Sequence, residues 1–186
     1  MPITFLNIVF MGTPDFAAHC LNDILNSEHN VVGVVTAPDR QSGRGRKVNE
    51  SAVKKLAVLK GLNIFQPEKL KSEEFHDALK SLNADLFVVV AFRMLPEVVW
   101  SMPNKGTINL HASLLPQFRG AAPIQRAIMQ GATESGATVF RLTHEIDTGN
   151  IICSTKVSIG PNENAGSLHD RILESGSHLL IDALNL

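Results

Sequence analysis

Short runs of apolar residues alternate along the chain with longer segments in which apolar residues recur every three or four positions. Runs of the first kind predict buried strands, and segments of the second kind predict amphipathic helices. Strands are expected at residues 5–11, 31–36, 63–65, 85–92, 105–110, 136–143 and 151–157. Helices are expected at residues 14–25, 51–60, 72–82, 96–100 and 123–130, and from Ser167, as the N-cap, toward the C-terminus.

The order of these elements decides the fold class. Strands that alternate with helices form a mostly parallel sheet with helices on both faces. Residues 86–92 are continuously apolar, as is typical of a central strand, whereas 151–157 is expected to pair at the edge with 136–143. We therefore expect an α/β fold, a Rossmann-like three-layer domain with a mostly parallel central sheet and an antiparallel edge. The length of 186 residues suits one such domain.

Composition and charge exclude several classes of protein. The formal net charge is -1, so a nucleic-acid partner could be met only through a local basic patch. The two cysteines, Cys20 and Cys153, are far apart and form no metal-binding pattern, which indicates a reduced protein without a structural metal. The longest uninterrupted apolar run is far shorter than the roughly 20 residues of a membrane span. We expect a cytoplasmic monomer with no membrane partner.

The most chemically competent residues lie near the end of the strand expected at 105–110. Asn109 and His111 are two positions apart, so an extended backbone points both side chains to one face. Imidazole exchanges protons near neutral pH, and an amide can donate a hydrogen bond to a developing oxyanion. Asp147, in a turn before Gly149, could orient the imidazole. The set predicts acyl transfer without a covalent nucleophile; the alternative is a packed histidine and a turn-forming aspartate.

Three other segments bear on ligand binding. Residues 113–116 are too apolar for an ordinary exposed turn, which indicates that they line a pocket. Residues 91–96 leave the buried strand at the carboxyl edge of the sheet, where open α/β folds bind ligands. The turn at 12–14 holds a single glycine in place of the G-x-G-x-x-G pattern, so we reject a nicotinamide dinucleotide site.

The segment 37–49 is the most basic local feature of the chain. Its glycines, Gly43 and Gly45, predict a flexible loop, and its arginines suit phosphate recognition by paired hydrogen bonds. A solvated loop with no ligand is the alternative. The basic residues of the segment are Arg40, Arg44, Arg46 and Lys47.

Several motifs that follow one another in the same order resemble one family. Residues 109–120 contain Asn-x-His-x-Ser-Leu-Leu-Pro and are followed by Asp147-Thr148-Gly149. This pattern is similar to the folate-dependent formyltransferases, which move a formyl group from 10-formyltetrahydrofolate to an amine. Residues 11–17, 38–46 and 119–125 resemble the methionyl-tRNA formyltransferase branch of that family. The resemblance runs from about Ile8 to the last helix.

The resemblance implies an enzyme of translation initiation that formylates the amino group of initiator methionyl-tRNA, with 10-formyltetrahydrofolate as co-substrate and no metal. It implies that Asn109 and protonated His111 stabilise the tetrahedral oxyanion, while Asp147 favours the charged imidazole and helps proton movement. The basic loop would enter the acceptor end of the tRNA. The residues implied for folate are Phe92, Arg93, Met94, Leu95, Ser113, Leu114, Leu115 and Pro116. Here the chain departs from the family's Ala-Tyr-Gly pattern, because the segment is shorter and carries Arg93.

Other readings share part of this pattern. Glycinamide ribonucleotide formyltransferases and sugar-nucleotide amine formyltransferases have the same catalytic motif, and a silent folate-binding or RNA-binding module is the alternative outside enzymes. The basic loop and residues 119–125 favour methionyl-tRNA. We expect residues 1–186 to be the catalytic domain, without the smaller C-terminal tRNA-binding β-barrel of the family, and hence to be part of a longer protein.

Overall fold

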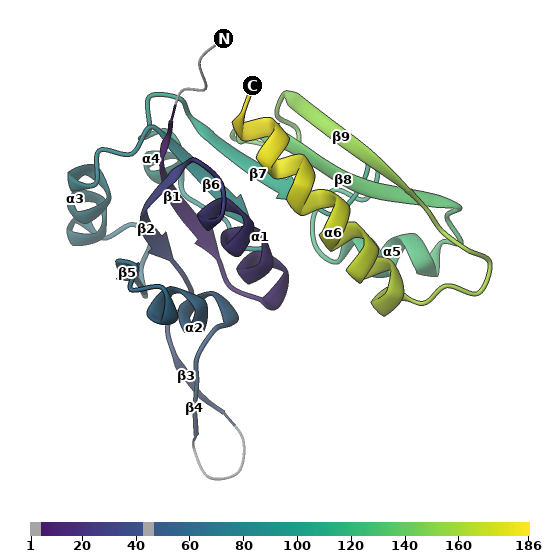
Figure 1. Cartoon of the computed structure of the whole chain (residues 1–186), viewed down its shortest axis with the longest axis horizontal. Helices are drawn as coiled ribbons and strands as arrows, with labels where there is room; N and C mark the ends of the chain where they lie inside the picture. The colour runs from purple at the N-terminus through teal and green to yellow at the C-terminus, as the bar shows by residue number, and fades with distance from the viewer. Residues whose placement is uncertain (1–4, 43–46) are drawn as a thin grey trace. The chain divides into compact units, whose positions relative to one another are not determined.

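The computed structural model describes residues 5–42 and 47–186 of the chain (Figure 1). Contacts group the chain into two compact units, residues 1–107 and 108–186.

The first unit is built on parallel strands. Its strands are β1 (Asn7–Gly12), β2 (Asn30–Val35), β5 (Ile64–Phe65) and β6 (Leu86–Val90). They lie in the order β5-β2-β1-β6, and each neighbouring pair is parallel. Strand β6 is buried along its whole length, as its unbroken apolar sequence predicts. It ends at Val90 rather than at residue 92, because Ala91 takes a positive φ of 46° that breaks the extended backbone.

Four helices accompany these strands: α1 (Asp15–Leu25), α2 (Ala52–Leu59), α3 (Glu73–Ser81) and the short α4 (Glu97–Trp100). Right-handed crossovers in this strand order put α1 and α2 on one face of the sheet and α3 on the other. Ser51 caps α2 as expected, since its side chain accepts a hydrogen bond from the Lys54 N–H. Cys20 on α1 is fully buried and belongs to the core.

The segment expected to be a flexible loop contains a two-stranded antiparallel ribbon. Strands β3 (Arg40–Ser42) and β4 (Lys47–Asn49) pair, with Arg40 opposite Asn49. The expectation of a plain loop was therefore wrong. Val48 is the single apolar residue in either strand, so the ribbon has no alternating apolar face that the sequence could show.

The second unit carries antiparallel strands. Strand β7 (Thr107–His111) pairs with β8 (Glu134–Arg141), which pairs with β9 (Ile151–Ser158). The helices of this unit are α5 (Pro123–Met129) and α6 (Ala165–Leu184). Helix α6 packs closely on β8, because a Cβ at Gly176 would lie 3.2 Å from the Cβ of Ala137. The predicted edge pairing of β9 with β8 is confirmed.

One predicted cap in the second unit was wrong. Helix α6 begins at Ala165, and its N-cap is Asn164 rather than Ser167. The Asn164 side chain accepts from the Ser167 N–H at 3.0 Å, so Ser167 already lies in the first helical turn. The Ser167 hydroxyl instead donates to Glu163.

The α/β fold class predicted from the sequence is confirmed: parallel strands with helices form the first unit, and antiparallel strands with helices form the second. Within residues 5–42 and 47–186, no helix has both the length and the apolar character needed to cross a bilayer.

Candidate active site

Strand β7 presents two polar side chains on one face. Ile108 and Leu110 are buried, whereas Asn109 and His111 are only partly buried, so the strand alternates as predicted. Across the ladder, His111 lies opposite Thr138 of β8. The prediction that Asn109 and His111 share a face is therefore confirmed.

The imidazole of His111 has a polar neighbour at each nitrogen. Its Nε2 lies 3.0 Å from the carbonyl oxygen of Phe118, and its Nδ1 lies 3.7 Å from Oδ2 of Asp147. A carbonyl can only accept a hydrogen bond, so Nε2 carries a proton and donates it. The nitrogen that faces the Asp147 carboxylate is then Nδ1. Both side chains are only 11 % exposed, which limits screening of this pair by water.

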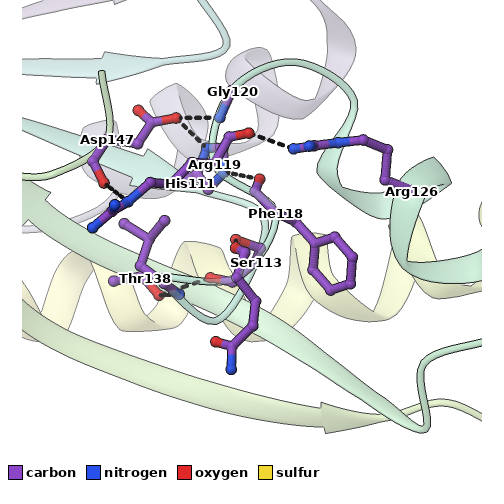
Figure 2. A network of polar contacts seen from close by, with 10 residues as sticks. His111, Ser113, Phe118, Arg119, Gly120, Arg126, Thr138 and Asp147 are labelled. Carbon is purple, nitrogen blue, oxygen red and sulfur yellow. Dashed lines mark hydrogen bonds and ion pairs between the residues drawn. The ribbon is translucent and has the colours of Figure 1, made fainter. Parts of the chain in front are cut away.

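Asp147 lies in a turn that is tied to the loop at residues 119 and 120. Its φ of +52° is left-handed, a conformation that is uncommon for residues other than glycine. The Gly120 N–H donates to Oδ2 of Asp147 at 2.7 Å, and Nε of Arg119 donates to the Asp147 carbonyl oxygen at 2.9 Å (Figure 2). The turn also needs Gly149, because a Cβ there would lie 1.6 Å from the Arg141 carbonyl oxygen.

The loop between β7 and α5 is anchored to the sheet by Thr138. The Thr138 hydroxyl donates to the Ser113 carbonyl at 2.7 Å and accepts from the Leu115 N–H at 3.1 Å. The Ser113 hydroxyl in turn donates to the Gln117 carbonyl at 2.6 Å. These bonds fix the backbone that leads to the Phe118 carbonyl, and through it the orientation of His111 (Figure 2).

Asn109 contrasts with these residues. Its side chain has no hydrogen-bond partner within the described parts of the chain, although it shares a face with His111. Its amide N–H groups are therefore available to an incoming oxygen atom. Together, a fixed imidazole, a carboxylate beside it and an unengaged amide can stabilise a tetrahedral oxyanion and move a proton.

Residues 113–116 differ from one another in their surroundings. Ser113 is fully buried and its hydroxyl is used within the loop, while Pro116 is exposed. Leu114 contributes to a cavity of about 270 Å³ in this unit. The cavity is lined by Leu114, Gln117, Phe118, Ala132, Thr133, Glu134 and Ser135.

The other segment predicted for folate, residues 92–95, lies in the first unit. The Arg93 guanidinium donates to the carbonyl oxygens of Pro67 and Glu68 and lies 5.6 Å from the centre of the Phe92 ring. Partial burial, followed by the positive charge of Arg40, lowers the pKa of Arg93 from its ordinary value. Met94 is exposed and Leu95 is buried. A joint folate site with residues 113–116 stays a prediction.

The residues predicted for tRNA are only partly visible. Arg40 is exposed on β3 and Lys47 lies in β4, whereas Arg44 and Arg46 fall outside the described residues. The base of the ribbon is fixed by Asp39, which pairs with Lys54 and accepts from Gln66 at 2.8 Å. The hydrogen bond from Lys54, followed by that from Gln66, lowers the pKa of the Asp39 carboxyl.

The described residues contain no cluster of histidine, cysteine, aspartate and glutamate side chains that could hold a metal ion.

The two cysteine thiols are poorly reactive. Burial is the main cause that raises the pKa of both thiols, Cys20 and Cys153, above their ordinary value. Both cysteines are free. A raised pKa makes each a poor nucleophile at neutral pH.

Sequence reasoning missed the part played by residues 118–120. Phe118 and Gly120 act through a backbone carbonyl and a backbone N–H, which any residue type supplies, so the sequence carries little signal for them. Both residues have positive φ values, 57° for Phe118 and 84° for Gly120. Of the two, only Gly120 is a residue type that favours this conformation, so only Gly120 could have been noticed in the sequence. Arg119 belongs to a motif that was noted for its resemblance but was given no role.

Comparison with known proteins defines the class. The model of the family described as formyl transferase matches residues 6–184, nearly the whole chain. The chain therefore belongs to the formyl transferase family.

Two curated relatives of the chain carry the same name. The chain is 54 % identical over 181 residues to the methionyl-tRNA formyltransferase of Flavobacterium johnsoniae, covering 97 % of this chain and 58 % of that protein. It is 53 % identical over 180 residues to the enzyme of the same name from Bacteroides fragilis, covering 97 % of this chain and 56 % of that protein. The chain thus spans little more than half the length of these curated relatives.

Solved structures support the fold. Glycinamide ribonucleotide transformylase 1 from Symbiobacterium toebii superimposes with a TM-score of 0.83 at 20 % identity, covering 98 % of this chain and 87 % of that one. A formyltetrahydrofolate deformylase from Pseudomonas syringae gives a TM-score of 0.78 at 21 % identity, covering 98 % and 61 %. At this identity the likeness concerns the fold alone.

Proposed function

We propose that the protein transfers a formyl group from 10-formyltetrahydrofolate to the amino group of initiator methionyl-tRNA, in the cytoplasm and in translation initiation. The observation that carries the proposal is the arrangement of Asn109, His111 and Asp147 in the second unit, in a chain about half identical to proteins named methionyl-tRNA formyltransferase. Both the geometry and the relatives support the same reaction.

In this reaction the α-amine attacks the formyl carbon directly and a tetrahedral intermediate forms. The Asn109 amide and protonated His111 stabilise the oxygen anion of the intermediate, as fixed donors do best. The new C–N bond remains when the bond from the formyl carbon to the folate nitrogen breaks. The proton lost by the amine reaches the departing folate nitrogen, so no charge accumulates and no covalent enzyme intermediate is needed.

Asp147 supports this chemistry through its charge. Its carboxylate lies beside Nδ1 of His111, so its negative charge can balance the positive charge of the ring that faces the anionic intermediate. The Gly120 N–H occupies the same carboxylate oxygen, which keeps the carboxylate in place during the reaction. We assign Asn109, His111 and Asp147 as the catalytic residues.

The folate and tRNA assignments extend the proposal. The apolar side chains of Leu114, Leu115 and Met94 and the ring of Phe92 are chemically suited to an aromatic co-substrate. The basic residues of segment 37–49, of which Arg40 is exposed, suit the phosphates of the tRNA acceptor end. We assign residues 92–95 and 113–116 to folate and the four basic residues of the segment to tRNA.

An acceptor assay tests the proposal. The protein is incubated with 10-formyltetrahydrofolate that carries a labelled formyl group, and with either methionyl initiator tRNA or glycinamide ribonucleotide. We expect label in formylmethionyl-tRNA and none in the ribonucleotide. Label transferred only to glycinamide ribonucleotide would assign the protein to purine synthesis instead, and label in neither acceptor would reject formyl transfer to both.

A further inference from the structure

Three consecutive residues, Phe118, Arg119 and Gly120, contact both members of the His111–Asp147 pair. Phe118 accepts from the imidazole, and Gly120 donates to the carboxylate. Phe118 and Gly120 use their backbone atoms in these contacts, whereas Arg119 uses its side chain: its Nε donates to the Asp147 carbonyl oxygen at 2.9 Å. Figure 2 shows the Arg119 side chain reaching the Asp147 backbone beside His111.

The Asp147 carboxylate is placed by its backbone. A left-handed φ of +52° is disfavoured for an aspartate, so the turn needs contacts that hold it. The bond from Arg119 holds the carbonyl of Asp147, and the bond from Gly120 holds its side chain, so the residue is fixed at two separate points. Loss of either bond leaves the carboxylate free to turn away from Nδ1 of His111.

We propose that Arg119 is a positioning residue that holds Asp147 against His111 for formyl transfer. The proposal rests on the function proposed above, but the contact itself is defined independently of the acceptor. Arg119 is exposed and binds no carboxylate within the described chain, so without this contact it would resemble any surface arginine.

This arrangement also distinguishes the two ring nitrogens of His111. Nε2 donates to the Phe118 carbonyl, an acceptor that cannot give a proton back, so Nε2 stays protonated. Nδ1 is the ring nitrogen that faces the Asp147 carboxylate, at 3.7 Å. A displaced carboxylate therefore changes the environment of Nδ1.

The test compares Arg119→Ala with Arg119→Lys, which keeps a donor at the end of a long side chain. The control is Arg171→Ala, because Arg171 also donates to a backbone carbonyl, that of Ser158, at 2.9 Å, but contacts neither Asp147 nor residues 118–120. We measure kcat and KM for 10-formyltetrahydrofolate and methionyl-tRNA, and the ring ¹⁵N resonances of His111 at neutral pH.

We expect Arg119→Ala to lower kcat roughly 10- to 100-fold, the scale of a small displacement of a catalytic group, with both KM values unchanged. Arg119→Lys should restore a large part of kcat, and Arg171→Ala should have the wild-type value. The His111 resonances should shift in Arg119→Ala only. Unchanged kcat and unchanged resonances in Arg119→Ala would overturn the positioning role.

The two readouts separate this inference from the proposed function. If the wild-type protein formylates neither acceptor, the proposed function fails, while the His111 resonances still decide whether Arg119 holds the pair. If the wild type is active but Arg119→Ala changes only KM, or is matched by Arg171→Ala, the proposed function stands and the positioning role is rejected.

Discussion

The hydroxyl of Thr138 is expected to stabilise both the fold of the second unit and the orientation of His111. Thr138 is fully buried, and its hydroxyl serves the Ser113 carbonyl and the Leu115 N–H. Thr138→Val preserves the shape of the side chain but leaves these two backbone groups without a partner. Each buried group left unpaired costs about 1–3 kcal/mol, so we expect the free energy of unfolding to fall by about 2–6 kcal/mol.

Urea unfolding followed by circular dichroism measures this loss, with Thr138→Ser as the matched control. Serine keeps the hydroxyl and should lose much less stability than valine. We also expect kcat to fall in Thr138→Val, because the anchored loop carries the Phe118 carbonyl that orients His111. A loss below about 0.5 kcal/mol, the range of neutral surface changes, would refute the anchoring role.

Three further predictions concern Asp147, Gly149 and Asp39. Asp147→Asn should lower kcat roughly 100-fold in steady-state assays, because it removes the negative charge 3.7 Å from Nδ1 of His111 and keeps much of the side-chain volume; a wild-type rate would contradict the coupling. Gly149→Ala should lower the melting temperature and kcat together, since the new Cβ would meet the Arg141 carbonyl at 1.6 Å, and a variant with both at wild-type values would show that the turn has room. The pKa of the Asp39 carboxyl is lowered from 3.8 in the folded protein, so the stability that its ion pair provides is present above that pH and is lost as the pH falls through the folded pKa. The urea midpoint of Asp39→Asn should therefore fall less steeply than that of the wild type as the pH is lowered. Equal slopes for the two proteins would count against this.

The sequence was most informative where burial dictates the pattern. The continuous apolar run of β6 and the alternation of β7 follow directly from which faces are packed, so both strands were predictable. The ribbon of β3 and β4 was not, because a strand pair without an apolar face leaves no periodic signal. The start of α6 was misplaced because Asn164 and Ser167 are both good capping residues, and only the backbone decides between them.

The same distinction applies to the site. Asn109 and His111 could be placed on one face from their spacing, and a motif suggested that Asp147 joins them. The groups that hold them, at Phe118 and Gly120, are backbone atoms in left-handed conformations, which no spacing rule reports. Residue type and spacing therefore predicted which side chains meet, but not the backbone groups that hold them.

The most direct test of the account is a single-turnover measurement of labelled formyl transfer to methionyl initiator tRNA by the wild type, Asn109→Ala and His111→Ala. The melting temperatures of all three proteins are compared first, so that a loss of activity is read only in variants that stay folded. We predict transfer by the wild type and a loss of roughly 100- to 1000-fold in each variant, the usual effect of removing one oxyanion donor. Wild-type rates of transfer in either variant would contradict the assignment of the active site to this face of β7.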